Sequence, residues 1–272
     1  MPKVLISDKL SPKAADIFND RGIAVDFRPG LSEDELREAI RDADGLAIRS
    51  ATTVTAELLD AADNLKVVGR AGIGVDNVNI EAATQCGVVV MNTPFGNSVT
   101  TAEHTIAMIM SLARQLPLAN ASTHAGKWEK SAFMGMEVAG KTIGLIGCGN
   151  IGSIVADRAH GLKMRVVVCD PFLSAERAMD LSIEKVDFDE LLARADIISV
   201  HAPLTDGTRN LLNADAIARM RDGVRIVNCA RGGIIVEATF AMQSKAEKLR
   251  VLQLMSLPKS PRGKIFYLAC LK

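Results

Sequence analysis

The sequence predicts an α/β protein with two domains, each built on a parallel β-sheet covered by helices. Strand-like and helix-like segments alternate along most of the 272 residues, and such alternation is typical of parallel sheets. A glycine-rich turn at residues 147–152 stands between a strand and a helix, as in dinucleotide-binding folds. The composition, with 48% hydrophobic and 24% charged residues, is sufficient for a sizeable buried core.

Residues 1–95 are expected to form the first domain. Ser32 and Glu35 make a capping box that opens one of its helices, and Asn92-Thr93-Pro94 marks its end. Apolar, β-branched runs predict strands at residues 3–7, 23–27, 46–48, 66–68 and 88–91. Helical periodicity predicts helices at residues 11–19, 33–40 and 79–85, and a short one from residue 55.

Residues 96–238 are expected to form the second domain. It opens with the longest helical pattern of the chain, residues 98–116, whose apolar side chains nearly encircle the helix. We expect this helix to be buried, in part against a second subunit. Residues 118–138 lack strong periodicity and are interpreted as an arm. Strands are predicted at residues 142–146, 165–169, 197–201 and 224–228, with helices at 154–162, 174–180, 188–193 and 213–220.

The glycine-rich turn predicts where a dinucleotide binds. Gly147 can make the tight turn, Gly149 lets a pyrophosphate touch the backbone, and Gly152 lets the helix lie close to the strand. The N-terminus of the helix offers unpaired N–H groups to the phosphates. Asp170 follows the next strand, where a carboxylate can accept both ribose hydroxyls and repels a 2′-phosphate. The expected cofactor is therefore NAD rather than NADP.

The composition argues against several classes of protein. Lys+Arg and Asp+Glu both total 32, so no net charge attracts nucleic acid or an anionic membrane. No segment resembles a signal peptide or a membrane span. The five cysteines are scattered without a CxxC pair, so we expect reduced thiols and no metal site. These features favour a soluble, cytoplasmic protein.

Arg231 is the leading candidate for chemistry. It lies in the loop Cys229-Ala230-Arg231-Gly232-Gly233 beyond a strand end, where ligands bind in open parallel sheets. A guanidinium can hold a carboxylate bidentately and polarise the adjacent oxygen. The alternative is a surface arginine that caps the strand end.

Two strand ends of the first domain carry weaker candidates. Arg49 and Arg70 could each grip a carboxylate or phosphate, or each could be a solvated surface charge. Gly72 and Gly74 bracket Ile73 in a turn that permits the close approach of a ligand. The alternative for this turn is a tight connection without a binding role.

In the second domain, Thr205 could donate to a ribose or phosphate, or could serve as a local turn cap. His201 ends a strand near the site and is interpreted as structural, as is His104 on the apolar helix. No histidine is placed to pair with Arg231 as an acid or base.

Six segments of the chain resemble a known family: residues 70–77 (RAGIGVDN), 92–115, 126–128 (GKW), 133–152, 201–205 (HAPLT) and 228–233 (NCARGG). They resemble the D-isomer-specific 2-hydroxyacid dehydrogenases, and the phosphoglycerate branch of that family most closely, from the N-terminus to Ala238. The resemblance implies a flavodoxin-like substrate domain, a Rossmann NAD-binding domain, and a homodimer formed through the region of the 98–116 helix. It also implies reversible hydride transfer between NAD and carbon 2 of a hydroxy acid, here 3-phosphoglycerate.

The resemblance also implies roles for individual residues. Those that bind NAD are Gly147, Gly149, Asn150, Ile151, Gly152 and Asp170, with Ile73, Thr205, Cys229, Ala230 and Arg231 along the rest of the cofactor. Arg231 is in addition the catalytic arginine that orients the substrate. The residues implied to bind the substrate anion are Arg49, Ser50, Arg70 and Gly72.

The chain departs from the family after Ala238. The family continues with a helix, a strand, a catalytic Glu and a His that moves the proton, whereas residues 239–272 contain no His and one acid, Glu247. Permissible codons for residues 246–261, read in a shifted frame, spell the missing segment. We therefore interpret residues 239–272 as a frameshifted, non-homologous tail that truncates the family sequence, and the Rossmann domain as incomplete. We expect an open sheet edge, an uncovered apolar face, and little or no dehydrogenase activity.

Two alternatives to an enzyme stay open. The same fold serves NAD-sensing transcriptional corepressors, so the chain could bind NAD without chemistry. It could also be a pseudogene product with no function. An NAD titration combined with a turnover assay separates these hypotheses, because binding without turnover favours the binding module and the absence of both favours the relic.

Overall fold

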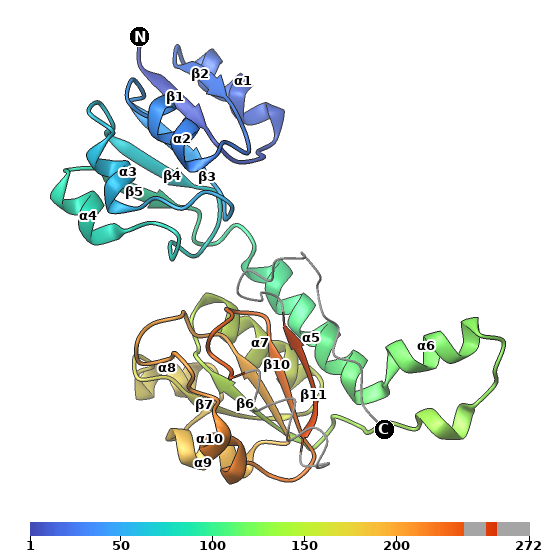
Figure 1. Ribbon diagram of the computed structural model, residues 1–272. Coiled ribbons are helices and arrows are strands. Elements are labelled where there is room, and N and C mark those ends of the chain that lie inside the picture. Colours follow the sequence, from blue (N-terminus) through green and yellow to red (C-terminus); the bar gives the residue numbers. More distant parts are fainter. Residues whose placement is uncertain (237–248, 255–272) are drawn as a thin grey trace. The chain divides into compact units, whose positions relative to one another are not determined.

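The computed structural model describes residues 1–236 and 249–254. The chain divides into two compact units, Met1–Asn97 and Ser98–Lys272, each with its own parallel sheet (Figure 1). The division thus falls after Asn97, whereas the sequence suggested residue 95.

The first unit has a five-stranded parallel sheet in the order β2-β1-β3-β4-β5. Its strands are β1 (Lys3–Ile6), β2 (Ala24–Phe27), β3 (Gly45–Ile48), β4 (Val67–Arg70) and β5 (Val89–Asn92). Its helices are α1 (Pro12–Asp20), α2 (Glu33–Ala39), α3 (Ala56–Asp60) and α4 (Ile80–Gln85). The strand order reverses between β1 and β3, as in flavodoxin-like sheets, so the predicted fold class is confirmed for this unit.

Capping side chains explain where these helices begin. The capping box of Ser32 and Glu35 is present at α2, Thr55 caps α3, and Asn79 caps α4. Each cap satisfies a backbone N–H that the first turn leaves without a helical partner. The predicted elements are accordingly of the right type, with bounds that differ by one or two residues.

One face of this sheet is only partly covered by the described residues. Helices α2, α3 and α4 pack on one face, whereas α1 packs on the other face near Val4 and Ile6. The pairing register places Val89 and Met91 of the edge strand β5 on that second face, where they are 58% and 59% exposed. A Cβ on Gly69 would meet nothing within 4 Å there. An uncovered apolar face, as expected from the sequence, is therefore present among the described residues.

Six parallel strands form the sheet of the second unit, in the order β11-β10-β9-β6-β7-β8. They are β6 (Thr142–Ile146), β7 (Arg165–Cys169), β8 (Glu184–Lys185), β9 (Ile197–Val200), β10 (Val224–Asn228) and β11 (Leu249–Leu254). Counted along the chain from β6, this is the strand order 3-2-1-4-5-6 of the Rossmann fold. The order reverses between β6 and β9, and the crevice beyond that point is where such sheets bind ligands.

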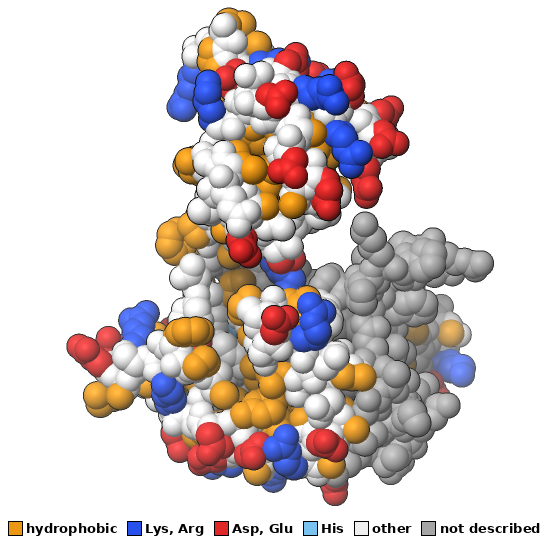
Figure 2. All heavy atoms as spheres, turned by 60° about the vertical axis from the view of Figure 1, so that its left-hand side comes forward, with side chains coloured by type: hydrophobic (Ala, Val, Ile, Leu, Met, Phe, Trp, Pro, Cys, Tyr) orange, Lys and Arg blue, Asp and Glu red, His pale blue; other side chains and the backbone are white. Residues whose placement is uncertain are grey.

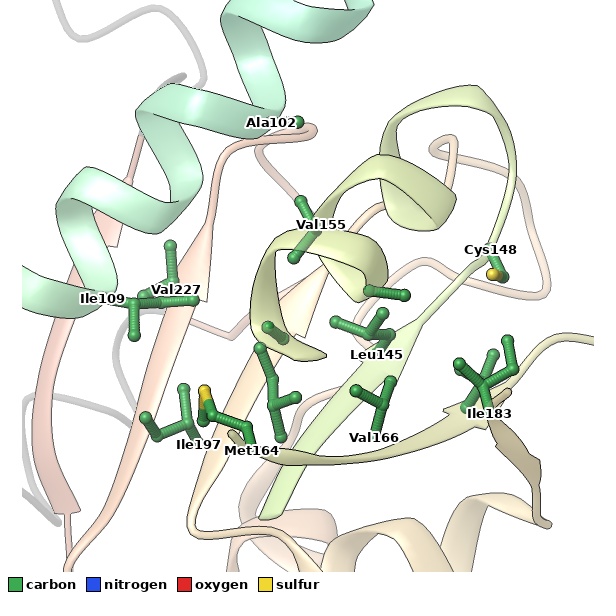
Figure 3. Close-up of a cluster of buried hydrophobic side chains, with 14 of the residues drawn as sticks. Ala102, Ile109, Leu145, Cys148, Val155, Met164, Val166, Ile183, Ile197 and Val227 are labelled. Carbon is green, nitrogen blue, oxygen red and sulfur yellow. The ribbon is translucent and has the colours of Figure 1, made fainter. Parts of the chain in front are cut away.

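Helices cover both faces of this sheet. On one face lie α5 (Ser98–Arg114), α7 (Asn150–Gly161) and α8 (Ala175–Asp180), and on the other α9 (Phe188–Arg194) and α10 (Ala214–Arg219). Figure 3 shows the first of these cores, in which Ile109 of α5 and Val155 of α7 lie among side chains of the sheet such as Leu145 and Val227. This burial fixes the start of α7 at the end of β6.

The helix predicted over residues 98–116 was too long. Gln115 adopts a left-handed conformation with φ 54°, so α5 ends at Arg114 and a separate helix, α6 (Leu116–His124), begins after it. Pro117 favours a new helix start, because it lacks the N–H that a continuing helix would need. The expected arm thus contains α6 and the 3₁₀ turn Lys130–Phe133, and α6 extends away from the sheet with no buried residue (Figure 1).

One strand of this sheet lies in the tail that was expected to begin after Ala238. Leu249–Leu254 forms β11, which pairs in parallel with β10, so β11 rather than β10 is the edge strand on this side of the sheet. The remainder of the tail expected after Ala238, residues 239–248 and 255–272, lies outside the described residues.

The surface of the described residues carries mixed charge. On the face drawn in Figure 2, Lys and Arg side chains are interspersed with Asp and Glu side chains, in keeping with equal totals of the two. None of the described helices has both the length and the apolar character that crossing a membrane requires.

Candidate active site

Three glycines shape the loop after β6. Gly147 has φ +94°, and a Cβ there would lie 2.9 Å from the carbonyl group of His201. A Cβ on Gly152 would collide with the carbonyl oxygen of Gly147, so its absence lets α7 start against the strand end. At Gly149, by contrast, a Cβ would meet nothing within 4 Å. The loop is thus packed against backbone atoms at Gly147 and Gly152, and its backbone is open to a ligand at Gly149.

The open position at Gly149 lies at the N-terminus of α7. Gly149 is the N-cap residue and supplies no side-chain hydrogen bond, so the first N–H groups of the helix, beginning with Asn150 and Ile151, stay available. An uncapped helix start with an open approach fits the pyrophosphate of a dinucleotide.

Asp170 lies directly beside this loop. Its Oδ2 accepts a hydrogen bond of 2.7 Å from the N–H of Cys148, and its Oδ1 accepts one of 2.8 Å from the N–H of Phe172. Two backbone donors therefore fix the orientation of the carboxylate, and each oxygen keeps a lone pair for another donor. A ribose diol is a donor set that this carboxylate can accept.

His201 lies against the packed side of the glycine loop, at Gly147, and not at the open Gly149 position. Its backbone adjoins Gly147, and its Nε2 lies 2.9 Å from the hydroxyl of the buried Ser199. Burial lowers the pKa of His201 to about 4, so the ring is neutral at pH 7. The position favours the structural role that the sequence suggested.

We expect the folded state to lose stability as the pH falls from about 6.5 to about 4. In the unfolded chain His201 takes up a proton near its ordinary pKa of 6.5, whereas the folded ring resists protonation until the pH approaches 4. The unfolded state binds more protons throughout this window, so stability present above pH 6.5 is lost below it. We expect a loss of about 3 kcal/mol. Thermal unfolding between pH 7 and pH 4 should show a flatter dependence in His201→Gln, and equal slopes for both proteins would contradict this.

The loop that carries Arg231 is folded by Asn228. The Oδ1 of Asn228 accepts from the N–H of Ala230 at 3.0 Å, and its Nδ2 donates to the carbonyl of Arg231 at 2.8 Å. The side chain of Asn228 is buried at the end of β10, so both bonds are shielded from water. Asn228 begins the NCARGG segment but was not among the predicted site residues; its position directly before a glycine-rich loop was the available signal.

Thr205 lies in a turn that Thr208 holds together. The hydroxyl of Thr208 donates to the carbonyl of Pro203 at 2.6 Å and accepts from the N–H of Thr205 at 2.8 Å. The Thr205 hydroxyl lies 3.1 Å from the Thr208 hydroxyl, which matches the local turn role considered above. The N–H of Asn210 donates to the carbonyl of Gly233, so the loops after β9 and β10 lie side by side.

The first unit presents a second group of candidates at the carboxyl ends of β3 and β4. Arg49 and Ser50 follow β3 and are exposed. Arg70 ends β4, and its guanidinium occupies the space that a Cβ on Gly72 would fill, so this glycine makes room for the arginine. The Nδ2 of Asn92 donates to the carbonyl of Ile73 at 2.7 Å and holds the turn between them.

Two family models match the chain. The catalytic domain of the D-isomer specific 2-hydroxyacid dehydrogenases matches residues 4–176, and the NAD binding domain of the same family matches residues 106–257. The second match extends past Ala238, where we expected the resemblance to end.

Individual relatives and solved structures agree with these matches. D-3-phosphoglycerate dehydrogenase of Archaeoglobus fulgidus is 45% identical over 259 residues, which are 95% of this chain and 49% of that protein. D-3-phosphoglycerate dehydrogenase of Homo sapiens is 48% identical over 244 residues, 89% of this chain and 46% of that protein. The chain therefore spans about half the length of the curated relatives it matches.

Among solved structures, the TT0316 protein from Thermus thermophilus superimposes with a TM-score of 0.88 at 31% identity, covering 98% of this chain and 86% of that chain. The NAD-dependent formate dehydrogenase from Staphylococcus aureus, solved in complex with NAD, gives a TM-score of 0.84 at 26% identity. That match covers 96% of this chain and 83% of the formate dehydrogenase.

Proposed function

Because this chain belongs to the D-isomer-specific 2-hydroxyacid dehydrogenase family and carries its NAD-binding domain, we propose that it binds NAD together with a phosphorylated 2-hydroxy acid. The proposed substrate is 3-phospho-D-glycerate, whose oxidation gives 3-phosphohydroxypyruvate, the first step of serine synthesis. The substrate rests on the relatives that bear the name D-3-phosphoglycerate dehydrogenase. The observation that carries the cofactor is the Asp170 carboxylate bonded to Cys148 beside the bare backbone of Gly149.

We assign the cofactor contacts within the second unit as follows. The Gly149 backbone and the first N–H groups of α7 hold the pyrophosphate, and Asp170 accepts the ribose hydroxyls and disfavours a 2′-phosphate. When bound, NAD supplies a hydride acceptor. Further proposed cofactor contacts in this unit are Gly147, Asn150, Ile151, Gly152, Thr205, Cys229 and Ala230. Ile73, which lies in the first unit, is a further proposed contact.

Arg231 is the proposed catalytic residue. Its guanidinium holds the substrate carboxylate in two hydrogen bonds and polarises the oxygen on carbon 2. Asn228 sets the loop that presents it. In the first unit, Arg49 and Ser50, with Arg70 and Gly72, are the proposed contacts for the anionic groups of the substrate.

Oxidation of an alcohol also requires a base for the hydroxyl proton, and here the chain differs from its family. Residues 239–272 contain no histidine. Of the four histidines, His104 lies in α5, His124 contacts the carbonyl of Asn120, His160 that of Leu181, and His201 the hydroxyl of Ser199. This favours a second candidate function, binding of NAD without turnover. We therefore propose that the 272-residue polypeptide binds NAD but turns over 3-phosphoglycerate weakly or not at all.

Titration of the purified polypeptide with NAD, followed by a turnover assay with 3-phospho-D-glycerate, tests both proposals. We expect binding of NAD and a turnover about 10²–10⁴-fold below that of an enzyme with its acid–base residue in place. Turnover equal to that of the human relative would contradict the proposed loss, and the absence of NAD binding would contradict the cofactor site. NADP is the matched control ligand and should bind more weakly.

We also propose that the polypeptide forms a homodimer through α5 and the arm. Val99 and Leu116 of these helices are exposed apolar side chains, as are Trp128 and Met134 beyond α6. Apolar surface of this kind is typical of subunit contacts. The sedimentation velocity of the same preparation reports whether the dimer forms.

A further inference from the structure

The strand order of the first unit reverses between β1 and β3, and ligands of open α/β sheets bind in the crevice beyond such a point. Asp8 follows β1 and residues 49–52 follow β3, so both lie at this crevice. Arg49 and Ser50 are exposed there, whereas Asp8 and Thr52 are only 4% and 9% exposed. A buried carboxylate at the position expected for a ligand therefore needs an explanation.

The carboxylate of Asp8 gathers the N–H groups of the loop. Its Oδ2 accepts from the N–H groups of Arg49 at 2.6 Å, Ala51 at 3.2 Å and Thr52 at 3.3 Å. Its Oδ1 accepts from the hydroxyl of Thr52 at 2.7 Å, and the hydroxyl of Ser7 lies 2.9 Å from the same hydroxyl. Hydrogen bonds to an ionised carboxylate are about twice as strong as those between neutral groups, so this is a rigid attachment.

The side chain of Asn77 holds the same loop by donating to two of the loop's backbone carbonyls. Its Nδ2 donates to the carbonyls of Arg49 at 2.7 Å and Thr52 at 2.6 Å. The backbone carbonyl of Asn77 accepts from the N–H of Val54 at 2.8 Å, which ties Asn77 to the chain just beyond the loop. Among the described residues, the N–H of Ser50 is the one backbone N–H of residues 49–52 that neither Asp8 nor another acceptor engages.

We propose that Asp8 is a positioning residue which, together with Asn77, fixes residues 49–52 as a preformed site for an anionic group of the substrate. The clamp leaves three donors for the anion: the Arg49 guanidinium, the Ser50 hydroxyl and the Ser50 N–H. This inference rests on the proposed substrate role of Arg49 and Ser50. Without the clamp, binding would have to order a loop of four residues, and each ordered residue costs about 1–2 kcal/mol of backbone entropy.

Asp8→Asn tests the clamp, with Asp44→Asn as a matched control. Asp44 also accepts a backbone N–H, that of Lys3 at 2.9 Å, but it precedes β3 and so lies at the opposite end of the sheet. Calorimetry on the full chain with NADH present gives the affinity for 3-phospho-D-glycerate, and a separate titration gives that for NAD. Amide hydrogen exchange at residues 49–52 reports the loop itself.

We expect Asp8→Asn to weaken the binding of 3-phospho-D-glycerate about tenfold to a hundredfold, to leave NAD affinity unchanged, and to speed exchange at the loop amides. Asp44→Asn should change none of these, even where it lowers thermal stability equally. Should Asp8→Asn fail to fold, Thr52→Val removes the bond to Oδ1 and the contact with the Ser7 hydroxyl but keeps the three N–H bonds to Oδ2. It should give a smaller loss in the same direction.

Substrate affinity that stays at the wild-type value in Asp8→Asn, or loop exchange that is unaltered, would overturn the clamp. If the wild-type chain itself does not bind 3-phospho-D-glycerate, the proposed function fails instead. Hydrogen exchange then still tests whether Asp8 fixes the loop. Faster exchange confined to residues 49–52 in Asp8→Asn supports this role, and unchanged exchange refutes it.

Discussion

Gly149→Ala is expected to lower the affinity for NAD by at least about a hundredfold while leaving the fold intact. Gly149 has φ −72°, outside the left-handed region that disfavours alanine, and its Cβ would meet nothing within 4 Å. The added methyl group would instead occupy the space in which the pyrophosphate approaches the backbone. Hydrogen bonds from the helix start to a charged phosphate contribute about 1.5–3 kcal/mol each, and displacing the phosphate loses them.

Two other glycines provide the contrast for this experiment. Gly161, the last residue of α7, also has open space around its Cβ position, so Gly161→Ala should leave NAD affinity unchanged. Gly147→Ala should unfold at a lower temperature, because φ +94° and the nearby carbonyl of His201 exclude a Cβ. Calorimetric Kd values and thermal unfolding of the three variants separate binding from stability. If Gly149→Ala binds NAD with wild-type affinity, the phosphate does not bind at this loop.

The features that the sequence could predict are those set by local interactions. A cap such as Ser32, Thr55 or Asn79 acts on an N–H three residues away, so its pattern is legible in one short segment. The spacing of Gly147, Gly149 and Gly152 is similarly local, and alternation of strands and helices was enough for the two sheets. Both domains were therefore predictable in class and order.

The features that could not be predicted depend on contacts between distant parts of the chain. Asp8 is 41 residues from Arg49 and Asn77 is 28 residues from it, so no local pattern connects the clamp with its loop. The pairing of β11 with β10 is equally non-local, and the composition of residues 249–254 did not indicate it. The break at Gln115 was missed for another reason: an apolar pattern continues through a residue whose backbone has left the helix.

Asp170→Asn is expected to shift the ratio of NAD to NADP affinity by about a hundredfold to a thousandfold toward NADP. The amide keeps the shape of the carboxylate but loses the charge, so hydrogen bonds from the ribose hydroxyls weaken and repulsion of a 2′-phosphate disappears. Asp196→Asn is the matched control, because Asp196 accepts the N–H of Thr142 at 2.9 Å at the opposite end of the same sheet. Titration of each variant with both nucleotides measures the ratio, which should be unchanged in Asp196→Asn.

The thiol of Cys148 gives a second, ligand-free readout of the same charge. Its pKa is raised to about 11, first by burial and then by the negative charge of Asp170. In Asp170→Asn the pKa of Cys148 should fall but stay above its ordinary value, because burial persists, and alkylation by iodoacetamide at about pH 9 should be faster. If Asp170→Asn lowers the pKa of Cys148 but leaves the ratio of NAD to NADP affinity unchanged, the Asp170 carboxylate acts on the loop without contacting the ribose. The preference for NAD would then have to arise from another group, and the role assigned to Asp170 would be wrong.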